Sequence, residues 1–155
     1  MIRLTFQSDL AAAEPVIWQT VSRMSGVNDE LWPLIRMTRR PDGSDPIFRA
    51  PLDDHVSFPS WILLFGVLPI DRHALAARST GSGFDERSSS WLQRSWHHCR
   101  RLDVIGGGTR VCDELEFEPR LRLLEPLVGP IIGIIFRHRH RRLVRRFGRL
   151  AGPGR

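Results

Sequence analysis

The sequence predicts an α+β fold made of one strand, two short helices, a run of antiparallel strands and a long final helix. Residues 2–8 alternate apolar and polar side chains, which is the pattern of a half-buried strand. Strand-like segments between residues 60 and 119 follow one another through short turns, which favours antiparallel pairing. The region from about Pro130 to about Leu150 has helical periodicity.

Two short helices are expected directly after the first strand. Pro15 stands at a suitable first helical position, because the first turn of a helix needs no hydrogen bond from that N–H. Ser25 and Gly26 are expected to end this helix. Asn28 is the expected N-cap of the second helix, whose first turn carries acidic residues.

The following segments are expected to alternate between strands and turns. Residues 39–46 are rich in Pro, Gly and Asp and predict a loop. Residues 60–70, "SWILLFGVLPI", predict one buried strand, and residues 73–79 predict another, followed by a turn at "TGSG".

Length and composition predict one folded domain. A chain of 155 residues with 41% hydrophobic residues can bury a substantial core. We expect a single domain over residues 1–150 and a disordered tail at residues 151–155, "AGPGR".

The positive charge is concentrated at the C-terminus. All 23 basic residues are arginine, and eight of them lie in residues 137–155, which contain no acidic residue. The other 15 arginines are set against 17 acidic residues, so the body of the chain is nearly neutral. Because the basic segment has no accompanying aromatic platform, nucleic acid is not the expected partner.

The remaining composition indicates a protein of the cytoplasm. Two cysteines, Cys99 and Cys112, do not make a disulfide-rich scaffold. The N-terminus lacks the pattern of a signal peptide. The longest apolar run, residues 127–136, is too short to span a bilayer, which takes about 20 residues. No cofactor or metal motif is present.

The stretch "RSWHHCRR", residues 94–101, suggests a metal or thiol site, but strand alternation argues against both. Residues 103–109 predict a turn, and pairing Asp103 with Gly108 sets a register for the hairpin. In that register the opposed pairs are Trp96 with Leu115, His97 with Glu114, His98 with Asp113, Cys99 with Cys112, Arg100 with Val111, and Leu102 with Thr109. Neighbouring residues point to opposite faces, so His97 and Cys99 face solvent while His98 faces the interior. Two histidines on opposite faces cannot share one metal ion, and no metal site is expected.

His98 and Asp113 are the sharper candidates. A carboxylate on the apolar face is costly unless it is paired, and an opposed imidazole supplies a partner that can also hold a proton. Arg94 and Arg100 share that face and offer other partners. Either these groups contact a ligand, or they form an internal polar network that satisfies only itself.

The final helix has one apolar and one basic side. The apolar stripe contains Ile132, Phe136, His140, Leu143, Phe147 and Leu150. The opposite side contains His138, Arg141, Arg142, Arg145 and Arg149. The basic side is either a solvated face or a surface that rests on an anionic membrane.

The order of elements resembles a known superfamily. The resemblance rests on "FQSDLAAAEPVIWQTVS", "GVNDELWP", "SWHHCRRL" with "GGGTRVCDELEFEP", and "FRHRHRRLVRRFG". In these stretches the chain is similar to the SRPBCC superfamily, the START-like or helix-grip fold of polyketide cyclase-like and lipid-transfer proteins. The resemblance implies a curved antiparallel sheet wrapped around the C-terminal helix, with a ligand cavity between them. The implied cavity wall contains Trp96, His98, Arg100, Asp113, Leu115, Phe117, Phe136, His140 and Leu143.

Two functions are compatible with such a cavity. The first is a carrier or sensor of a hydrophobic or amphipathic small molecule, such as a lipid, fatty acid or polyketide-like compound, which would enter near Trp32 and Pro33. The second is a cyclase- or dehydratase-like enzyme. In that enzyme His98 would be the general base, Asp113 would orient it, and Arg100 or His140 would stabilise an oxyanion. Neither function requires a cofactor.

Overall fold

The computed structural model describes residues 1–49 and 55–150. The expected disordered tail, residues 151–155, lies outside the described residues. The elements in chain order are β1 (Ile2–Leu10), α1 (Glu14–Val21), α2 (Met24–Leu31), β2 (Ile35–Met37), β3 (Val56–Leu64), β4 (Leu68–Ser79), β5 (Gly83–Ser90), β6 (Gln93–Ile105), β7 (Gly108–Pro119), the 3₁₀ turn η1 (Arg122–Leu124) and α3 (Glu125–Phe147).

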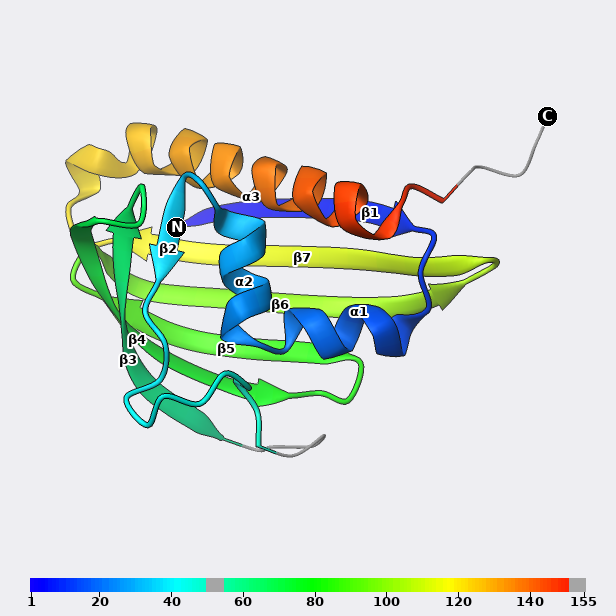
Figure 1. Cartoon of the computed structure of the whole chain (residues 1–155). Helices are drawn as coiled ribbons and strands as arrows, with labels where there is room; N and C mark the ends of the chain where they lie inside the picture. Colours follow the sequence, from blue (N-terminus) through cyan, green and yellow to red (C-terminus); the bar gives the residue numbers. More distant parts are fainter. Residues whose placement is uncertain (50–54, 151–155) are drawn as a thin grey trace.

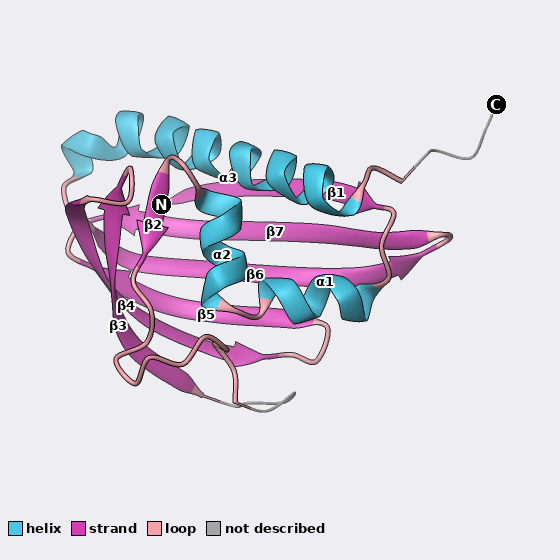
Figure 2. Ribbon diagram, viewed as in Figure 1, coloured by secondary structure: helices cyan, strands magenta, loops and turns pink. Residues whose placement is uncertain are grey.

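The described strands form one antiparallel sheet in the order β1-β7-β6-β5-β4-β3-β2. Figure 1 shows the sheet curling, with α3 running along its open side and α1 and α2 crossing the concave face. The separation of helices and strands into two layers is clear in Figure 2. The predicted α+β helix-grip fold, with two short helices after the first strand, is therefore confirmed.

Three apolar clusters fill the space between the sheet and the helices. The first joins α2 to β3, β4 and β5 through Met24, Val27, Leu31, Phe58, Leu75 and Phe84. The second packs α1 and the C-terminal half of α3 against β1, β6 and β7, and the third packs Phe136 of α3 on Leu115 and Phe117 of β7. Between the first and third clusters the interior is not fully packed, and the cavity described below lies there.

Residues 60–70 are not one strand. They contain the end of β3, a turn and the start of β4, so the expected single strand is wrong. Phe65 and Gly66 have φ angles of 50° and 76°, which are left-handed and turn the chain back on itself. The run reads as a buried strand because the turn is apolar, yet Val67 is 79% exposed.

The helix boundaries also differ from those expected. α1 ends at Val21, not at Ser25 and Gly26. α2 begins at Met24, so Asn28 lies inside it and is not its N-cap. The Asn28 side chain instead bonds the backbone N–H and C=O of Met37 at 2.7 and 2.9 Å, and so ties α2 to β2.

α3 begins and ends earlier than the periodicity predicts. It starts at Glu125, with Pro126 in the first turn, where a helix tolerates proline, and Pro130 lies inside the helix. It ends at Phe147, where Gly148 takes a φ of 76°, so Leu150 lies outside the helix. The expected stripe is buried at Phe136, His140 and Leu143 and half-buried at Ile132 and Phe147. Gly129, Gly133 and Arg139 are also buried.

The register of the β6–β7 hairpin is shifted by two residues from the expected one. The turn is tighter than expected: Gly106 and Gly107 connect Ile105 to its partner Gly108. The opposed pairs are Trp96 with Phe117, His97 with Glu116, His98 with Leu115, Cys99 with Glu114, Arg100 with Asp113, Arg101 with Cys112, and Leu102 with Val111. Because the shift is an even number of residues, the side chains from Trp96 to Leu102 keep their predicted faces. Arg94, expected on the inner face beside His98, is exposed and pairs with Glu118 at 3.7 Å, because the register changes between Gln93 and Ser95. Cys112, expected to face solvent, is nevertheless buried.

Candidate ligand cavity and buried ionic network

A cavity of about 320 Å³ lies between the concave face of the sheet, α2 and the first half of α3. Its wall is mainly apolar. Buried side chains of Met24, Phe48 and Phe84 line one end, and the exposed side chains of Ile70, Leu92 and Ile131 line the other. The exposed end is therefore the mouth, and the buried end is the floor.

A small group of polar side chains interrupts the apolar wall. Five come from the sheet: Asp71, His73, Glu86, Gln93 and His98. Arg139 of α3 is the sixth. All six are buried, so each must be paired within the protein or with a bound molecule.

Behind this wall, Arg100 is the centre of a buried ionic network. Its guanidinium is 0% exposed and holds two carboxylates, both in bidentate geometry. Arg100 Nε and Nη2 donate to Asp113 Oδ1 and Oδ2, both at 2.7 Å. Nη1 and Nη2 donate to Glu30 Oε1 and Oε2 at 2.9 and 3.0 Å. These contacts of Arg100 join β6 to β7 through Asp113 and to α2 through Glu30.

α3 enters the same network through two side chains. Arg139 Nε donates to Glu30 Oε2 at 2.9 Å, and its guanidinium carbon lies 4.7 Å from the centre of the Phe136 ring. His140 Nε2 donates to Asp113 Oδ2 at 3.0 Å, while His140 Nδ1 lies 2.8 Å from Ser8 Oγ of β1. The final helix is thus held to the sheet and to α2 by buried polar bonds as well as by apolar packing.

His98 and His73 extend the network to the cavity. His98 Nε2 donates to Asp113 Oδ1 at 2.8 Å, and His98 Nδ1 lies 3.6 Å from Glu86 Oε2. Glu86 Oε1 accepts from His73 Nε2 at 2.6 Å and from Ser88 Oγ at 2.8 Å. A continuous series of hydrogen bonds and ion pairs therefore runs from Glu30 of α2 to His73 on the cavity wall.

Burial and charge act in opposite directions on these groups. Burial tends to raise the pKa of Glu30 and Asp113, but the facing Arg100 outweighs it and holds each pKa below its usual range. Burial likewise opposes ionisation of Glu86, yet His73 and His98 lower its pKa. The pKa of His73 is raised, because Glu86 outweighs the burial that would lower it. The raised pKa of His73 favours the protonated imidazole beside Glu86, in a network that also contains three carboxylates and two arginines.

The structure separates the predicted site residues into two groups. Trp96, His98 and Phe136 line the cavity. The other six predicted wall residues are not part of its lining: Arg100, Asp113 and His140 lie in the ionic network, Leu115 and Phe117 pack behind Phe136, and Leu143 packs with α1.

This placement bears on the two functions that the sequence left open. The enzyme hypothesis needs Arg100 or His140 at the ligand, but both lie outside the cavity lining and bind Asp113. His98 presents its ring to the cavity between Phe84 and Phe136, while its nitrogen atoms face Asp113 and Glu86. Arg100 and Asp113 therefore belong to an internal polar network whose members bind one another. His98 belongs to this network and also to the cavity wall.

Four important polar residues are absent from the sequence prediction. Glu30 and Arg139 pair across 109 positions of the chain, so no local pattern connects them. His73 and Glu86 were open to detection by alternation: His73, Leu75 and Ala77 share one face of β4, and Phe84 and Glu86 share one face of β5. That signal places a histidine and a carboxylate on the concave side of adjacent strands.

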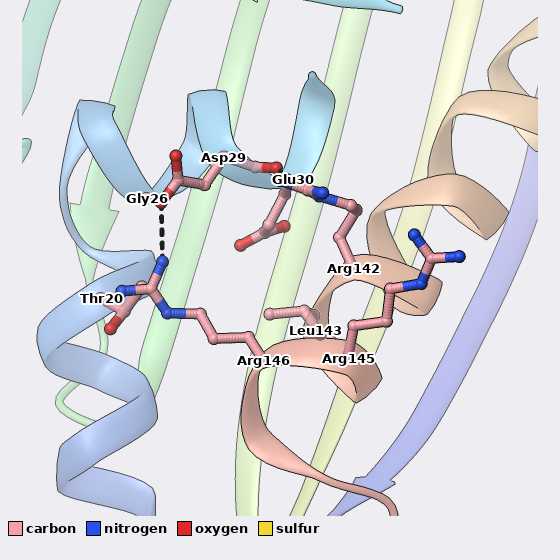
Figure 3. Close-up of a pocket in the computed structure, with 8 residues that line it drawn as sticks. All are labelled: Thr20, Gly26, Asp29, Glu30, Arg142, Leu143, Arg145 and Arg146. Carbon is pink, nitrogen blue, oxygen red and sulfur yellow. Dashed lines mark hydrogen bonds and ion pairs between the residues drawn. The ribbon is translucent and has the colours of Figure 1, made fainter. Parts of the chain in front are cut away.

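A second, shallower pocket of about 260 Å³ lies between α1, α2 and the end of α3. Figure 3 shows Arg142 and Arg146 of α3 reaching toward α2, whereas the guanidinium of Arg145 points away from Asp29. Arg146 Nη1 donates to Asp29 Oδ2 at 2.6 Å, and Arg142 Nε donates to the Asp29 carbonyl at 2.9 Å. Arg142, one of the arginines expected on the solvated side, therefore tethers α3 to α2 together with Arg146. His138, expected on the same side, bonds the carbonyl of Trp32, the residue after α2, at 2.8 Å.

One known protein family matches the sequence of this chain. The model of a family described as Domain of unknown function (DUF8410) matches residues 8–147. The chain belongs to this family. None of the curated proteins matches the sequence of this DUF8410 domain.

Solved structures that resemble the DUF8410 domain share its fold. A protein from Chromobacterium violaceum has a TM-score of 0.67 at 11% identity, over 94% of this chain and 96% of its own. A START superfamily protein from Mycobacterium smegmatis has a TM-score of 0.60 at 15% identity, with the same coverage. An aromatase/cyclase from a Streptomyces species has a TM-score of 0.66 at 7% identity, over 94% and 92%. The predicted SRPBCC/START-like fold is thereby confirmed.

Two further observations concern membranes and metals. None of the helices in the described part of the chain has the length and apolar character needed to cross a bilayer. Within residues 1–49 and 55–150, no cluster of three or more His, Cys, Asp and Glu side chains is arranged to hold a metal ion.

Proposed function

We propose that this DUF8410 domain binds a hydrophobic or amphipathic small molecule in the cavity between the sheet and α3, as a carrier or sensor. The observation that carries the proposal is the cavity itself: about 320 Å³, mainly apolar, open at one end, with a few buried polar groups on one wall. Such a combination favours an apolar ligand whose orientation is set by a few polar contacts.

The mouth supports the same function. Trp32 and Pro33, near which the sequence placed the entry, do not line the cavity, and the mouth lies instead between the exposed side chains of Ile70, Leu92 and Ile131. A ligand entering there passes apolar side chains and reaches the floor formed by Met24, Phe48 and Phe84. Lipids, fatty acids and polyketide-like compounds fit this description, and solved relatives of the fold include a START superfamily protein and an aromatase/cyclase.

Filling the cavity is expected to abolish binding. Ala77 lines the cavity on β4, whereas Ala74 points away from it on the same strand and is exposed. Native mass spectrometry of protein isolated from cells should detect one retained apolar molecule per chain. Ala77→Phe should lose that molecule and Ala74→Phe should keep it, because only the former occupies the ligand's volume.

Two results would contradict this expectation. The first is wild-type protein that neither retains an apolar molecule from cells nor takes one up from a lipid extract. The second is a folded Ala77→Phe variant, verified by circular dichroism, that retains the same molecule at wild-type occupancy.

A second candidate function is peripheral contact with an anionic membrane, favoured by the exposed side of α3. Leu127, Ile131 and Ile134 are exposed in its first half, and Arg141 and Arg145 continue the same spacing of three and four residues in its second half. A helix stripe with apolar and then basic side chains suits a negatively charged lipid surface.

Vesicle binding tests this second function. Co-sedimentation with vesicles containing phosphatidylserine should weaken as salt is raised, because the arginine contribution is screened. Ile134→Glu should lower the binding constant about tenfold, since it removes apolar contact and adds repulsion. Val104→Glu, an equal change at an exposed site outside α3, should leave binding unchanged. Binding that is absent, or insensitive to both salt and Ile134→Glu, would refute membrane contact.

A further inference from the structure

Gln93 is the polar group on the cavity wall whose acceptor is not satisfied. Its side chain is 7% exposed and lines the cavity. Among the described residues, none donates a hydrogen bond to Gln93 Oε1. A buried carbonyl oxygen without a donor costs about 1–3 kcal/mol. The Gln93 side chain therefore destabilises the fold unless a bound molecule supplies the donor.

A bulge at the start of β6 directs Gln93 to the cavity. Simple alternation from Trp96 and His98 would turn residue 93 toward the outer face of the sheet. The register shifts between Gln93, which pairs with Pro119, and Ser95, which pairs with Glu118. The extra residue, Arg94, brings Gln93 to the same side as Trp96. Bulges of this kind re-aim side chains and occur preferentially beside functional sites.

The neighbouring wall is also rich in acceptors. Asp71 and Glu86 line the cavity as carboxylates. Asp71 Oδ1 accepts from the backbone N–H groups of Arg72 and Leu92 at 2.8 and 3.2 Å, and Glu86 accepts from His73 and Ser88. An anionic ligand end near Gln93 would meet the Asp71 carboxylate, while the basic groups of the same wall, Arg139 and His73, already donate to Glu30 and Glu86. An ammonium would add the cost of burying a charge against the neutral amide of Gln93.

We infer that the polar end of the ligand is an uncharged hydrogen-bond donor, a hydroxyl group, which donates to Gln93 Oε1 near the mouth while the apolar part lies toward Phe48 and Phe84. This inference rests on the proposed function and narrows its ligand class. Alcohols, sterol-like and phenolic compounds belong to the class, and free fatty acids do not.

Calorimetric titration with three compounds of similar size tests the inference. 2-Naphthol donates a hydrogen bond, 2-methoxynaphthalene cannot donate, and 2-naphthoate is anionic. The wild-type domain should bind 2-naphthol about tenfold more tightly than the ether, the ratio expected when one buried acceptor gains its donor. It should bind 2-naphthoate more weakly than either.

Gln93→Leu should remove the preference for 2-naphthol. The variant deletes the unsatisfied oxygen and should fold at least as stably as the wild type, so an effect on binding is not an effect of unfolding. The two uncharged compounds should then bind with equal affinity. Gln19→Leu, the same change at an exposed position of α1, should keep the wild-type ratio.

The outcomes separate this inference from the proposed function. Equal wild-type affinities for 2-naphthol and its ether, a ratio unchanged by Gln93→Leu, or tightest binding of 2-naphthoate would overturn the hydroxyl ligand and leave the cavity as a binding site. Failure of all three compounds to bind the wild type would count against the proposed function, and the ligand class would be refuted together with it.

Discussion

Replacing Arg100 with methionine is expected to lower the free energy of unfolding by about 3–5 kcal/mol, the cost of removing one partner from a buried ion pair. Arg100 is fully buried and binds both Asp113 and Glu30. Methionine fills a similar volume but leaves two carboxylates in the interior. Urea unfolding followed by tryptophan fluorescence measures the change. Arg100→Lys, which keeps the charge but cannot make two bidentate contacts, should fall between the wild type and the methionine variant.

The neighbouring residue provides a matched control. Arg101 follows Arg100 on β6, points to the opposite face and pairs with exposed Glu114 at 2.6 Å. Arg101→Met should change stability by less than about 1 kcal/mol, because exposed ion pairs contribute little. Equal losses in Arg100→Met and Arg101→Met would show that the buried network does not stabilise the fold.

Acid should unfold the protein through the three carboxylates of the buried ionic network. Glu30, Asp113 and Glu86 each have a pKa below the usual range of about 4, because their cationic partners outweigh burial. A carboxyl whose folded pKa is lowered stabilises the fold above its unfolded pKa and loses that contribution as the pH falls through the folded value. Unfolding free energy should therefore fall steeply once the pH drops below about 4.

Comparison of variants shows which carboxyl group causes the loss of stability at low pH. Asp113→Asn should be less stable at pH 7 and should show a shallower fall toward low pH, since the amide does not titrate. Glu114→Gln, at the adjacent exposed carboxyl, should keep the wild-type slope. The assignment is wrong if the Asp113→Asn profile runs parallel to that of the wild type.

His73 predicts a second, weaker change on the alkaline side. Its pKa is raised by Glu86, so the protonated imidazole stabilises the fold below its unfolded pKa of about 6.5 and the contribution is lost as the pH rises through the higher folded value. Stability should therefore decline above neutral pH in the wild type. His73→Gln should be flat over that window, and an unchanged alkaline decline in that variant would remove His73 as its cause.

Local periodicity was sufficient for most of the architecture. Alternation over two residues placed Trp96, His98 and Arg100 on the inner face, and this assignment holds although the register was wrong by two residues. Helical spacing placed Phe136, His140 and Leu143 on the buried side of α3. Both patterns are properties of neighbouring residues, so the sequence alone could reveal them.

The contents of the site depended on contacts that no local pattern contains. The size of the glycine turn decided that Arg100, not His98, stands opposite Asp113. Glu30 reaches Arg100 across 70 positions, and these contacts withdraw Arg100 and Asp113 from the cavity. The bulge that turns Gln93 inward arises where β6 meets β7.

The sequence by itself determined the faces of side chains in the regular parts of the strands and of α3, because the period of a strand or helix is set by the backbone. The tertiary structure alone decided which inward side chains neutralise one another and which remain open to a ligand, because burial and charge act over distances that only the folded chain creates.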